Sequence, residues 1–291
     1  MRPEPTSILD TRDAPRSGTR GAAARSAAAY LLLVAGALLT VAPLVLSGLT
    51  AAKTPRQFAG ESALAPPHPV TLDNFRTVLD QGLGRAVAVT ALMTVCITCG
   101  QLLTSILAAY AFARTSFPGR DALFWVYLGT MMVPSAVTLI PLYLMFAKLG
   151  WLNSFWALVL PFVFGSPYAI FLLRQYFRAI PGELIDAARM DGAGTLDILV
   201  HVVVPMSRPI LATLTVITVV SQWNNFMWPL VAASGAKWQV LTVATATLQT
   251  QYNAQWPLIM AATTLAIAPL VVLFVVCQRQ VLRSITWTGL K

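Results

Sequence analysis

The chain has 291 residues, of which 57% are hydrophobic and only 11% are charged, proportions that exclude a soluble globular domain and a disordered chain. Its 20 basic residues outnumber the 11 acidic ones and give a formal net charge of +9. The basic residues lie at the ends of apolar runs, which is typical of a membrane protein and not of a nucleic-acid-binding surface interleaved with aromatics.

Residues 1–25 are polar and rich in Pro, Gly, Ser and Arg, which predicts a disordered N-terminal tail. About 20 apolar residues in a helix span the bilayer core, and a single segment can satisfy its backbone there only as a helix. The expected fold is an all-α polytopic membrane protein, with a transmembrane domain over 26–278 and a tail over 279–291. Six stretches free of charged residues predict six transmembrane helices: 26–52, 86–113, 122–147, 149–173, 209–236 and about 256–277.

The distribution of Lys and Arg predicts the orientation of the spans. The side that holds both termini and the 114–121 and 174–208 loops carries 14 of the 20 basic residues. Because Lys and Arg are enriched in cytoplasmic loops, this side is expected to be cytoplasmic. Both termini are therefore predicted to lie inside the cell, as an N-in, C-in topology.

The 174–208 loop between the fourth and fifth spans is long enough to hold structure of its own. Pro181 suits a first helical turn, and Glu183 and Asp186 follow near the positive end of the helix dipole. Gly192 can end a helix in the left-handed conformation. These signals predict a short cytoplasmic helix over 181–192.

A second short helix is predicted to start at Thr195, with the Thr195 hydroxyl as its cap and Asp197 in its first turn. Pro205 is expected to interrupt this helix, and Pro209 to open the fifth span. Local chemistry alone favours a surface helix that merely links two spans, because charged loop helices are common.

The same loop contains a spaced motif. Asp186-Ala187-Ala188 is followed after three residues by Gly192, and after nine more by the run 202–205, which ends in Pro205. This pattern resembles the motif of permease subunits of binding-protein-dependent ABC importers, Glu-Ala-Ala, three residues, Gly, nine residues, Ile-x-Leu-Pro. The chain departs from it in Asp for Glu at the first position and in Val for Ile and Leu.

The resemblance covers roughly residues 26–291 and points to the carbohydrate-uptake branch, of the maltose and glycerol-3-phosphate type. It implies that the 181–192 helix is a coupling helix that docks on a separate cytoplasmic ATPase. The ATPase-coupling residues so implied are Glu183, Asp186, Ala187, Ala188, Asp191, Gly192 and Pro205. The runs that carry the wider likeness are 71–75, 132–134, 140–141, 171–177 and 222–226.

No catalytic site, metal site or cofactor site is predicted on this chain. It has no G-x-x-x-x-G-K-[ST] phosphate loop, so ATP and Mg²⁺ would be bound by partner ATPase subunits. Cys96 and Cys99 lie in an apolar run far in sequence from both histidines, and are interpreted as packing residues. The predicted spans contain no Asp, Glu, Lys or Arg, which disfavours an ion-coupled secondary transporter.

The polar run inside the fifth span is the candidate substrate pathway: Gln222, Trp223, Asn224, Asn225 and Phe226. Amides offer both donors and acceptors for sugar hydroxyls, and aromatic faces suit the C–H faces of a pyranose. The alternative is interhelical hydrogen bonding that stabilises the bundle.

The predicted function is a multi-pass permease subunit of the bacterial cytoplasmic (inner) membrane, which imports a sugar or sugar-like solute. The implied partners are a second, homologous permease subunit, an ATPase dimer and an external substrate-binding protein. A glycerol-3-phosphate or glycerophosphodiester importer subunit is the alternative substrate class. An autonomous ion-coupled transporter and a non-transporting membrane scaffold are the alternatives of other classes.

Overall fold

In the computed structural model, residues 19–62, 64–251 and 255–288 are described, and these residues form only helices and their connections. The elements in chain order are α1 (Thr19–Ala51), α2 (Pro55–Gly60), α3 (Asp73–Val78), π-helical η1 (Leu79–Leu83), α4 (Gly84–Arg114), α5 (Arg120–Gly129), 3₁₀-helical η2 (Thr130–Met132), α6 (Ser135–Lys148), α7 (Phe155–Val159), α8 (Pro167–Ala179), α9 (Gly182–Met190), α10 (Thr195–Ile198), π-helical η3 (Leu199–Val203), α11 (Val204–Met206), α12 (Arg208–Trp223), α13 (Met227–Ala232), α14 (Leu241–Gln251) and α15 (Trp256–Thr288).

Three helical stretches of the described chain are long and apolar enough to cross a membrane: Arg25–Ala51, Asp73–Arg114 and Trp256–Gln278. Two bent helix pairs raise this number to five if each is one span. The first joins Arg120–Met132 to Ser135–Lys148 at 97°, and the second joins Thr195–Met206 to Arg208–Trp223 at 79°.

The predicted span over 149–173 is wrong as a continuous helix. Its residues are divided between α7 and α8, and 160–166 lie between the two helices. Pro161 and Pro167 each lack the N–H that a helix interior needs, and Gly165 lowers helix propensity between them. The number of six membrane spans is not reproduced and stays a prediction.

Part of the predicted N-terminal tail is helical. Helix α1 begins at Thr19, so residues 19–25 are helical, whereas residues 1–18 lie outside the described part of the chain. At the other end, α15 continues to Thr288, so most of the predicted C-terminal tail prolongs the last helix. Residues 289–291 lie outside the described residues.

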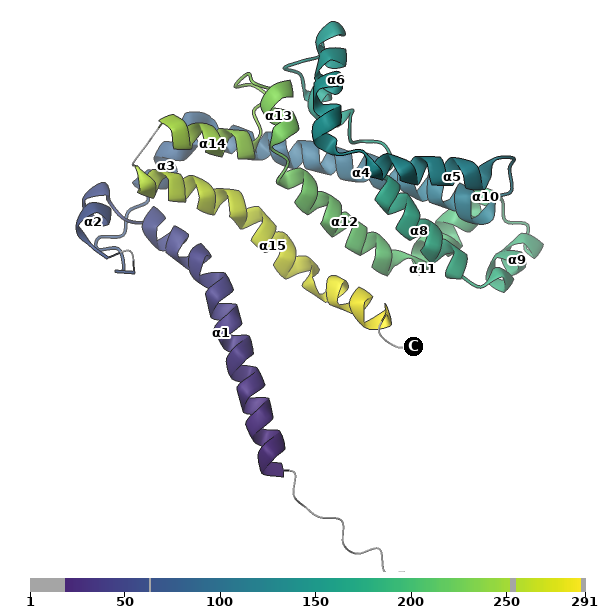
Figure 1. Ribbon diagram of the computed structural model, residues 1–291, viewed down its shortest axis with the longest axis horizontal. Helices are drawn as coiled ribbons and strands as arrows, with labels where there is room; N and C mark the ends of the chain where they lie inside the picture. Colours follow the sequence, from purple (N-terminus) through teal and green to yellow (C-terminus); the bar gives the residue numbers. More distant parts are fainter. Residues whose placement is uncertain (1–18, 63, 252–254, 289–291) are drawn as a thin grey trace, which may run out of the picture.

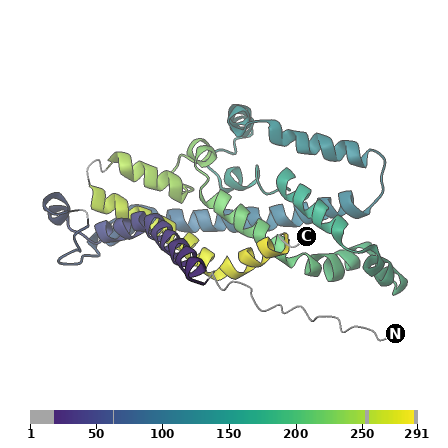
Figure 2. The same cartoon turned by 60° about the horizontal axis from the view of Figure 1, so that its bottom comes forward.

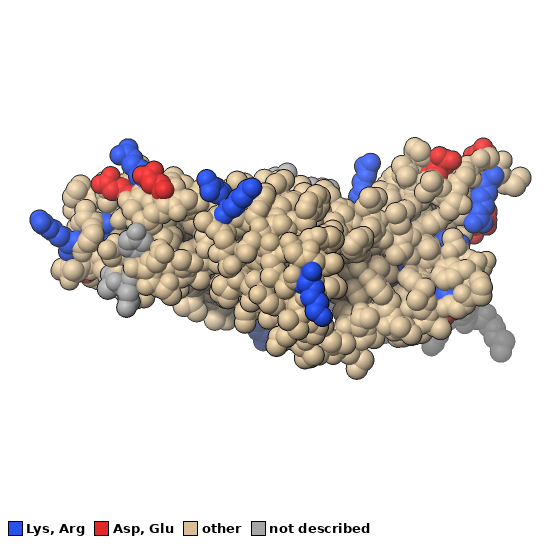
Figure 3. All heavy atoms as spheres, turned by 90° about the horizontal axis from the view of Figure 1, so that it is seen from above, with Lys and Arg blue, Asp and Glu red and all other residues tan. Residues whose placement is uncertain are grey.

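Helix α4 is the central element, and it packs against α8 and α12, while α15 packs against α1 and α12 (Figure 1). Helices α9 and α10 lie at one end of the elongated molecule, and α2 and α3 lie at the opposite end, as the turned view also shows (Figure 2). The acidic side chains visible from above gather towards these two ends (Figure 3). Between the ends this face is mostly uncharged, with a few separate Lys and Arg side chains.

Candidate functional site: the α9 loop and the segment after α12

Helix α9 is the predicted short helix, and its C-terminal end is built as the sequence indicates, whereas Pro181 lies at the N-cap and not in the first turn as predicted. Pro181 precedes it in an extended conformation, and Gly192 has a φ of 85°. The Gly192 N–H donates to the Arg189 carbonyl (3.0 Å), and the Ala193 N–H donates to the Ala188 carbonyl (3.0 Å). These two bonds form a Schellman motif, which requires the left-handed residue that glycine supplies without strain.

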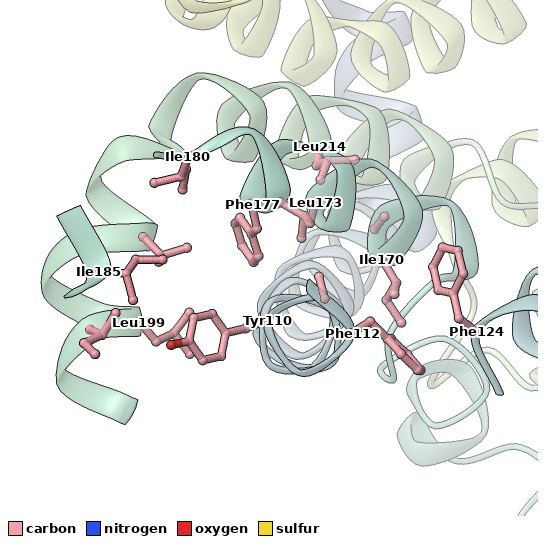
Figure 4. Close-up of a cluster of buried hydrophobic side chains, with 14 residues drawn as sticks. Tyr110, Phe112, Phe124, Ile170, Leu173, Phe177, Ile180, Ile185, Leu199 and Leu214 are labelled. Atoms are coloured by element: carbon pink, nitrogen blue, oxygen red, sulfur yellow. The ribbon is translucent and has the colours of Figure 1, made fainter. Parts of the chain in front are cut away.

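One face of α9 is anchored to the rest of the protein by a single buried side chain, Ile185, which is 3% exposed. Ile185 enters a cluster of apolar side chains that also contains Tyr110 of α4 and Leu199 of η3 (Figure 4). Ala188, one turn further on, packs partly against the same cluster. The helix is therefore attached to α4 and to the 195–206 segment through hydrophobic contact.

The opposite face of α9 is exposed. Glu183, Leu184 and Ala187 are exposed on it, and Met190 is 88% exposed. Asp186 forms an ion pair with Arg189 at 3.2 Å, and both side chains are largely in solvent, where such a pair contributes little stability. This face offers acidic, apolar and small side chains that are not committed to the protein core.

The seven predicted coupling residues are thus divided by the structure. Glu183, Asp186 and Ala187 lie on the exposed face, and Asp191 and Gly192 form the exposed end of the helix. Ala188 faces the core instead, and Pro205 lies in α11, away from the helix itself.

The second helix of the loop starts at Thr195, but the predicted Thr195 cap is wrong. Gly194 occupies the N-cap position, and the Asp197 carboxylate reaches back to accept its N–H at 3.1 Å. Pro205 does not end the helix. The residues just before it are π-helical, and the chain stays helical to Met206. The 79° bend follows, and Pro209 lies in the first turn of α12 as predicted.

The candidate pathway segment lies at a break in the membrane region. Helix α12 ends at Trp223, and α13 starts at Met227. Residues 222–226 lie beside two cavities of about 350 and 630 Å³, sizes that are ordinary for small-molecule sites. The smaller cavity is lined by Trp223, Asn224, Phe226 and residues of α14 and α15. The larger is lined by Gln222, Asn224, Asn225, Phe226 and residues of α6 and α13.

The polar side chains of this segment differ in how far their hydrogen-bonding groups are already used within the protein. Trp223 is buried, and its Nε1–H donates to the Ala266 carbonyl of α15 at 3.1 Å. Asn225 donates to the side-chain oxygen of Gln222 at 3.4 Å, and Gln222 is 8% exposed. Asn224 is exposed and lines both cavities, although its amide also donates to the Val220 carbonyl at 2.8 Å.

The larger cavity also contains polar side chains that sequence analysis did not select. Ser135 and Thr138 of α6 contribute hydroxyls, and Ser221 adds a third. Ser221 adjoins the polar run 222–226 in sequence, whereas nothing in the sequence near Ser135 and Thr138 selects them from the other hydroxyls of the apolar runs. In the described chain, no group of three His, Cys, Asp or Glu residues is placed to hold a metal ion.

Comparison with known proteins gives concordant results. The family described as binding-protein-dependent transport system inner membrane component matches residues 100–287. The arabinooligosaccharides transport system permease protein of Halalkalibacterium halodurans is 32% identical over 238 residues, which is 80% of this chain and 84% of that protein. An sn-glycerol-3-phosphate transport system permease protein of Yersinia pestis is 32% identical over 265 residues, or 88% and 94% of the two chains.

Two solved chains share the fold. One belongs to a bacterial ABC transporter involved in the import of the acidic polysaccharide alginate, with a TM-score of 0.79 and 24% identity, over 91% of this chain and 99% of that one. The other comes from the alginate ABC transporter in complex with an alginate pentasaccharide-bound periplasmic protein, with a TM-score of 0.60, 14% identity, and coverage of 89% and 93%.

Proposed function

This chain belongs to the family of binding-protein-dependent transport system inner membrane components, and from that membership we propose that it is the permease subunit that moves a neutral sugar or oligosaccharide inward. The family places it in the inner membrane as a transport subunit. Relatives that cover most of its length are named for arabinooligosaccharides and for sn-glycerol-3-phosphate, which supports a carbohydrate-like solute.

The observation that carries the proposal is the two-sided construction of α9. Ile185 anchors one face, and the other face presents Glu183, Asp186 and Ala187 to solvent at one end of the molecule. Such a helix can receive an ATPase on its free face and pass a displacement to the core through its buried face. Ala188, Asp191, Gly192 and Pro205 would support this coupling helix by packing, by ending it and by shaping the chain behind it.

The remaining parts of the importer follow from this role. A partner ATPase dimer would bind ATP and Mg²⁺, and a second, homologous permease would complete the pathway. An external binding protein would deliver the solute. Six spans with both termini inside, a transmembrane domain over 26–278 and a coupling loop over 174–208 would place α9 on the ATPase side, as the excess of Lys and Arg there supports.

The cavity linings support an uncharged solute. Of the described residues that line the two cavities beside 222–226, none is charged, while amides, hydroxyls and aromatic rings are present in both. An anionic solute such as glycerol-3-phosphate or its diesters would have to leave water without a cationic partner from this chain, which is costly. The relatives named for sn-glycerol-3-phosphate keep that class as the second candidate.

Reconstitution into liposomes tests the proposal. The complete transporter should take up a labelled neutral oligosaccharide only with ATP and the loaded binding protein, and excess glycerol-3-phosphate should not compete. Competition by glycerol-3-phosphate would favour the second candidate. Uptake by this chain alone, driven by an ion gradient without ATP, would contradict the proposal and support a secondary transporter. An assembled complex that moves no solute would support a scaffold.

A further inference from the structure

Two arginines join α4 and α8 near their C-terminal ends, one from each helix. Arg114, the last residue of α4, donates to the Phe177 carbonyl from Nε (3.1 Å) and Nη2 (2.6 Å), and also to the Ile180 carbonyl. Arg174 of α8 donates back to the Phe112 carbonyl of α4 at 3.3 Å. Each helix therefore supplies a guanidinium that binds backbone of the other.

Arg174 extends this connection to α5. Its side chain is only 9% exposed, and its Nη2 lies 3.2 Å from the Asp121 carboxylate. The guanidinium carbon lies 4.0 Å from the centre of the Phe124 ring, a cation–π distance. Arg114, Arg174 and Asp121 together form what we call the arginine clasp, which connects α4, α5 and α8.

Adhesion between these helices does not need the clasp. Phe112, Phe124, Leu173 and Phe177 already lie in one buried apolar cluster, which holds α4, α5 and α8 together (Figure 4). A guanidinium is a rigid planar fork, and it fixes the direction of the groups it binds more strictly than apolar contact does. The apolar cluster thus holds α4, α5 and α8 together, and the clasp fixes the angles at which they meet.

The position of the clasp connects the two candidate sites. Arg114 holds the Ile180 carbonyl, and α9 begins at Gly182. Helix α8 has 13 residues and is therefore about 20 Å long. The segment just before its N-terminal end contributes Phe162 to the lining of the larger cavity. Helix α5 leads through the 97° corner to Ser135, which lines the same cavity.

We propose that the arginine clasp makes α4, α5 and α8 move as one body when α9 is displaced, so that the displacement reaches the Phe162 and Ser135 walls of the cavity. This rests on the proposed function, in which α9 receives the ATPase. Arg114 and Arg174 are positioning residues in this scheme, because they contact neither solute nor nucleotide. Without them, α9 would move while α5 stayed behind, and ATP would be hydrolysed with little transport.

The test measures solute uptake and ATP hydrolysis together in liposomes that hold the complete transporter. R114Q and R174Q should retain ATP hydrolysis but lower the uptake per ATP about two- to thirty-fold, the range expected when a coupling element is weakened. Q175A shortens an exposed, uncharged side chain of the same helix α8 and should match the wild type. R114K should fall between, since an ammonium cannot bind both carbonyls in a planar fork.

The outcomes separate this inference from the proposed function. A wild-type complex without ATP-driven uptake would refute the proposed function itself. An active wild type with normal uptake per ATP in R114Q and R174Q, or an equal loss in Q175A, would overturn the clasp. Should R114Q fail to assemble, R114K decides: a lowered ratio supports the clasp, and an unchanged ratio assigns Arg114 to folding alone.

Discussion

Shortening the side chain of Ile185 should release α9 from the core while leaving its exposed face intact. Ile185 is 3% exposed and is the buried side chain of this helix. Ile185→Val removes one buried carbon, worth about 0.8 kcal/mol, and Ile185→Ala removes three, worth about 2.4 kcal/mol. Alanine recovers about 0.4 kcal/mol through its higher helix propensity, so the net loss is about 2 kcal/mol.

These losses of free energy determine how large a fraction of α9 is undocked from the core. Since each 1.4 kcal/mol is a factor of ten, Ile185→Val should raise the population of the undocked helix about fourfold, and Ile185→Ala about thirtyfold. A cavity left behind in the cluster would increase the second value. Amide hydrogen exchange of the 182–190 segment in the purified transporter measures these populations directly.

Met190→Ala is the control, because Met190 lies on the same helix and is 88% exposed. Substitutions at such positions usually change stability by less than about 0.5 kcal/mol, so exchange should stay close to the wild type. Equal acceleration in Met190→Ala and Ile185→Ala, or no gradation from Val to Ala, would refute the claim that Ile185 anchors the helix.

Three further predictions concern other parts of the chain. Gly192→Asp should leave membrane insertion intact but lower uptake per ATP. Gly192 has a φ of 85°, which L-residues adopt at a cost of about 1–2 kcal/mol. Normal uptake with this variant alone would contradict the coupling role. Gly100→Ala should lower the melting temperature of the complex, since its Cβ would lie 2.3 Å from a methyl of Val163, whereas Gly129→Ala has nothing within 4 Å and should not. Asn224→Ala should raise the KM for uptake about fivefold, the value of one net hydrogen bond, and an unchanged KM in transport assays would remove Asn224 from the pathway.

Local features of the 174–208 loop could be predicted because their causes lie within a few residues. Gly192 ends α9 as expected, since a left-handed glycine after a helix acts on the neighbouring backbone alone, while Pro181 lies at the N-cap, one position before the first turn predicted for it. The Thr195 cap was wrong for an equally local reason. Gly194 is the N-cap and its N–H donates to the Asp197 carboxylate, so the helix begins at Thr195, one residue earlier than a Thr195 cap would require.

The cavities could not be predicted, because they depend on residues far apart in sequence. The division of 149–173 into α7 and α8 has a local cause in Pro161 and Pro167, but membrane helices also tolerate proline, so the charge-free run predicts one span. Ser135 meets Asn224 across the larger cavity from nearly ninety positions away. Nothing near Ser135 in sequence distinguishes it from the other hydroxyls of the apolar runs.

The separation of charged from uncharged groups explains how the parts of the proposed importer depend on one another. The cavity linings on this chain are neutral, so a solute there meets amides, hydroxyls and rings that bind it without a desolvated charge. The described residues of this chain that line the two cavities include no ionisable group to which ion binding could supply energy. The charged contacts instead lie towards the two ends of the molecule, with the Arg76–Asp73 pair in α3 at one end and the arginine clasp and the Asp186–Arg189 pair on the α9 side. Energy for transport would therefore enter at α9, and rigid connections such as Arg174 to Asp121 would have to convey it to the neutral cavity.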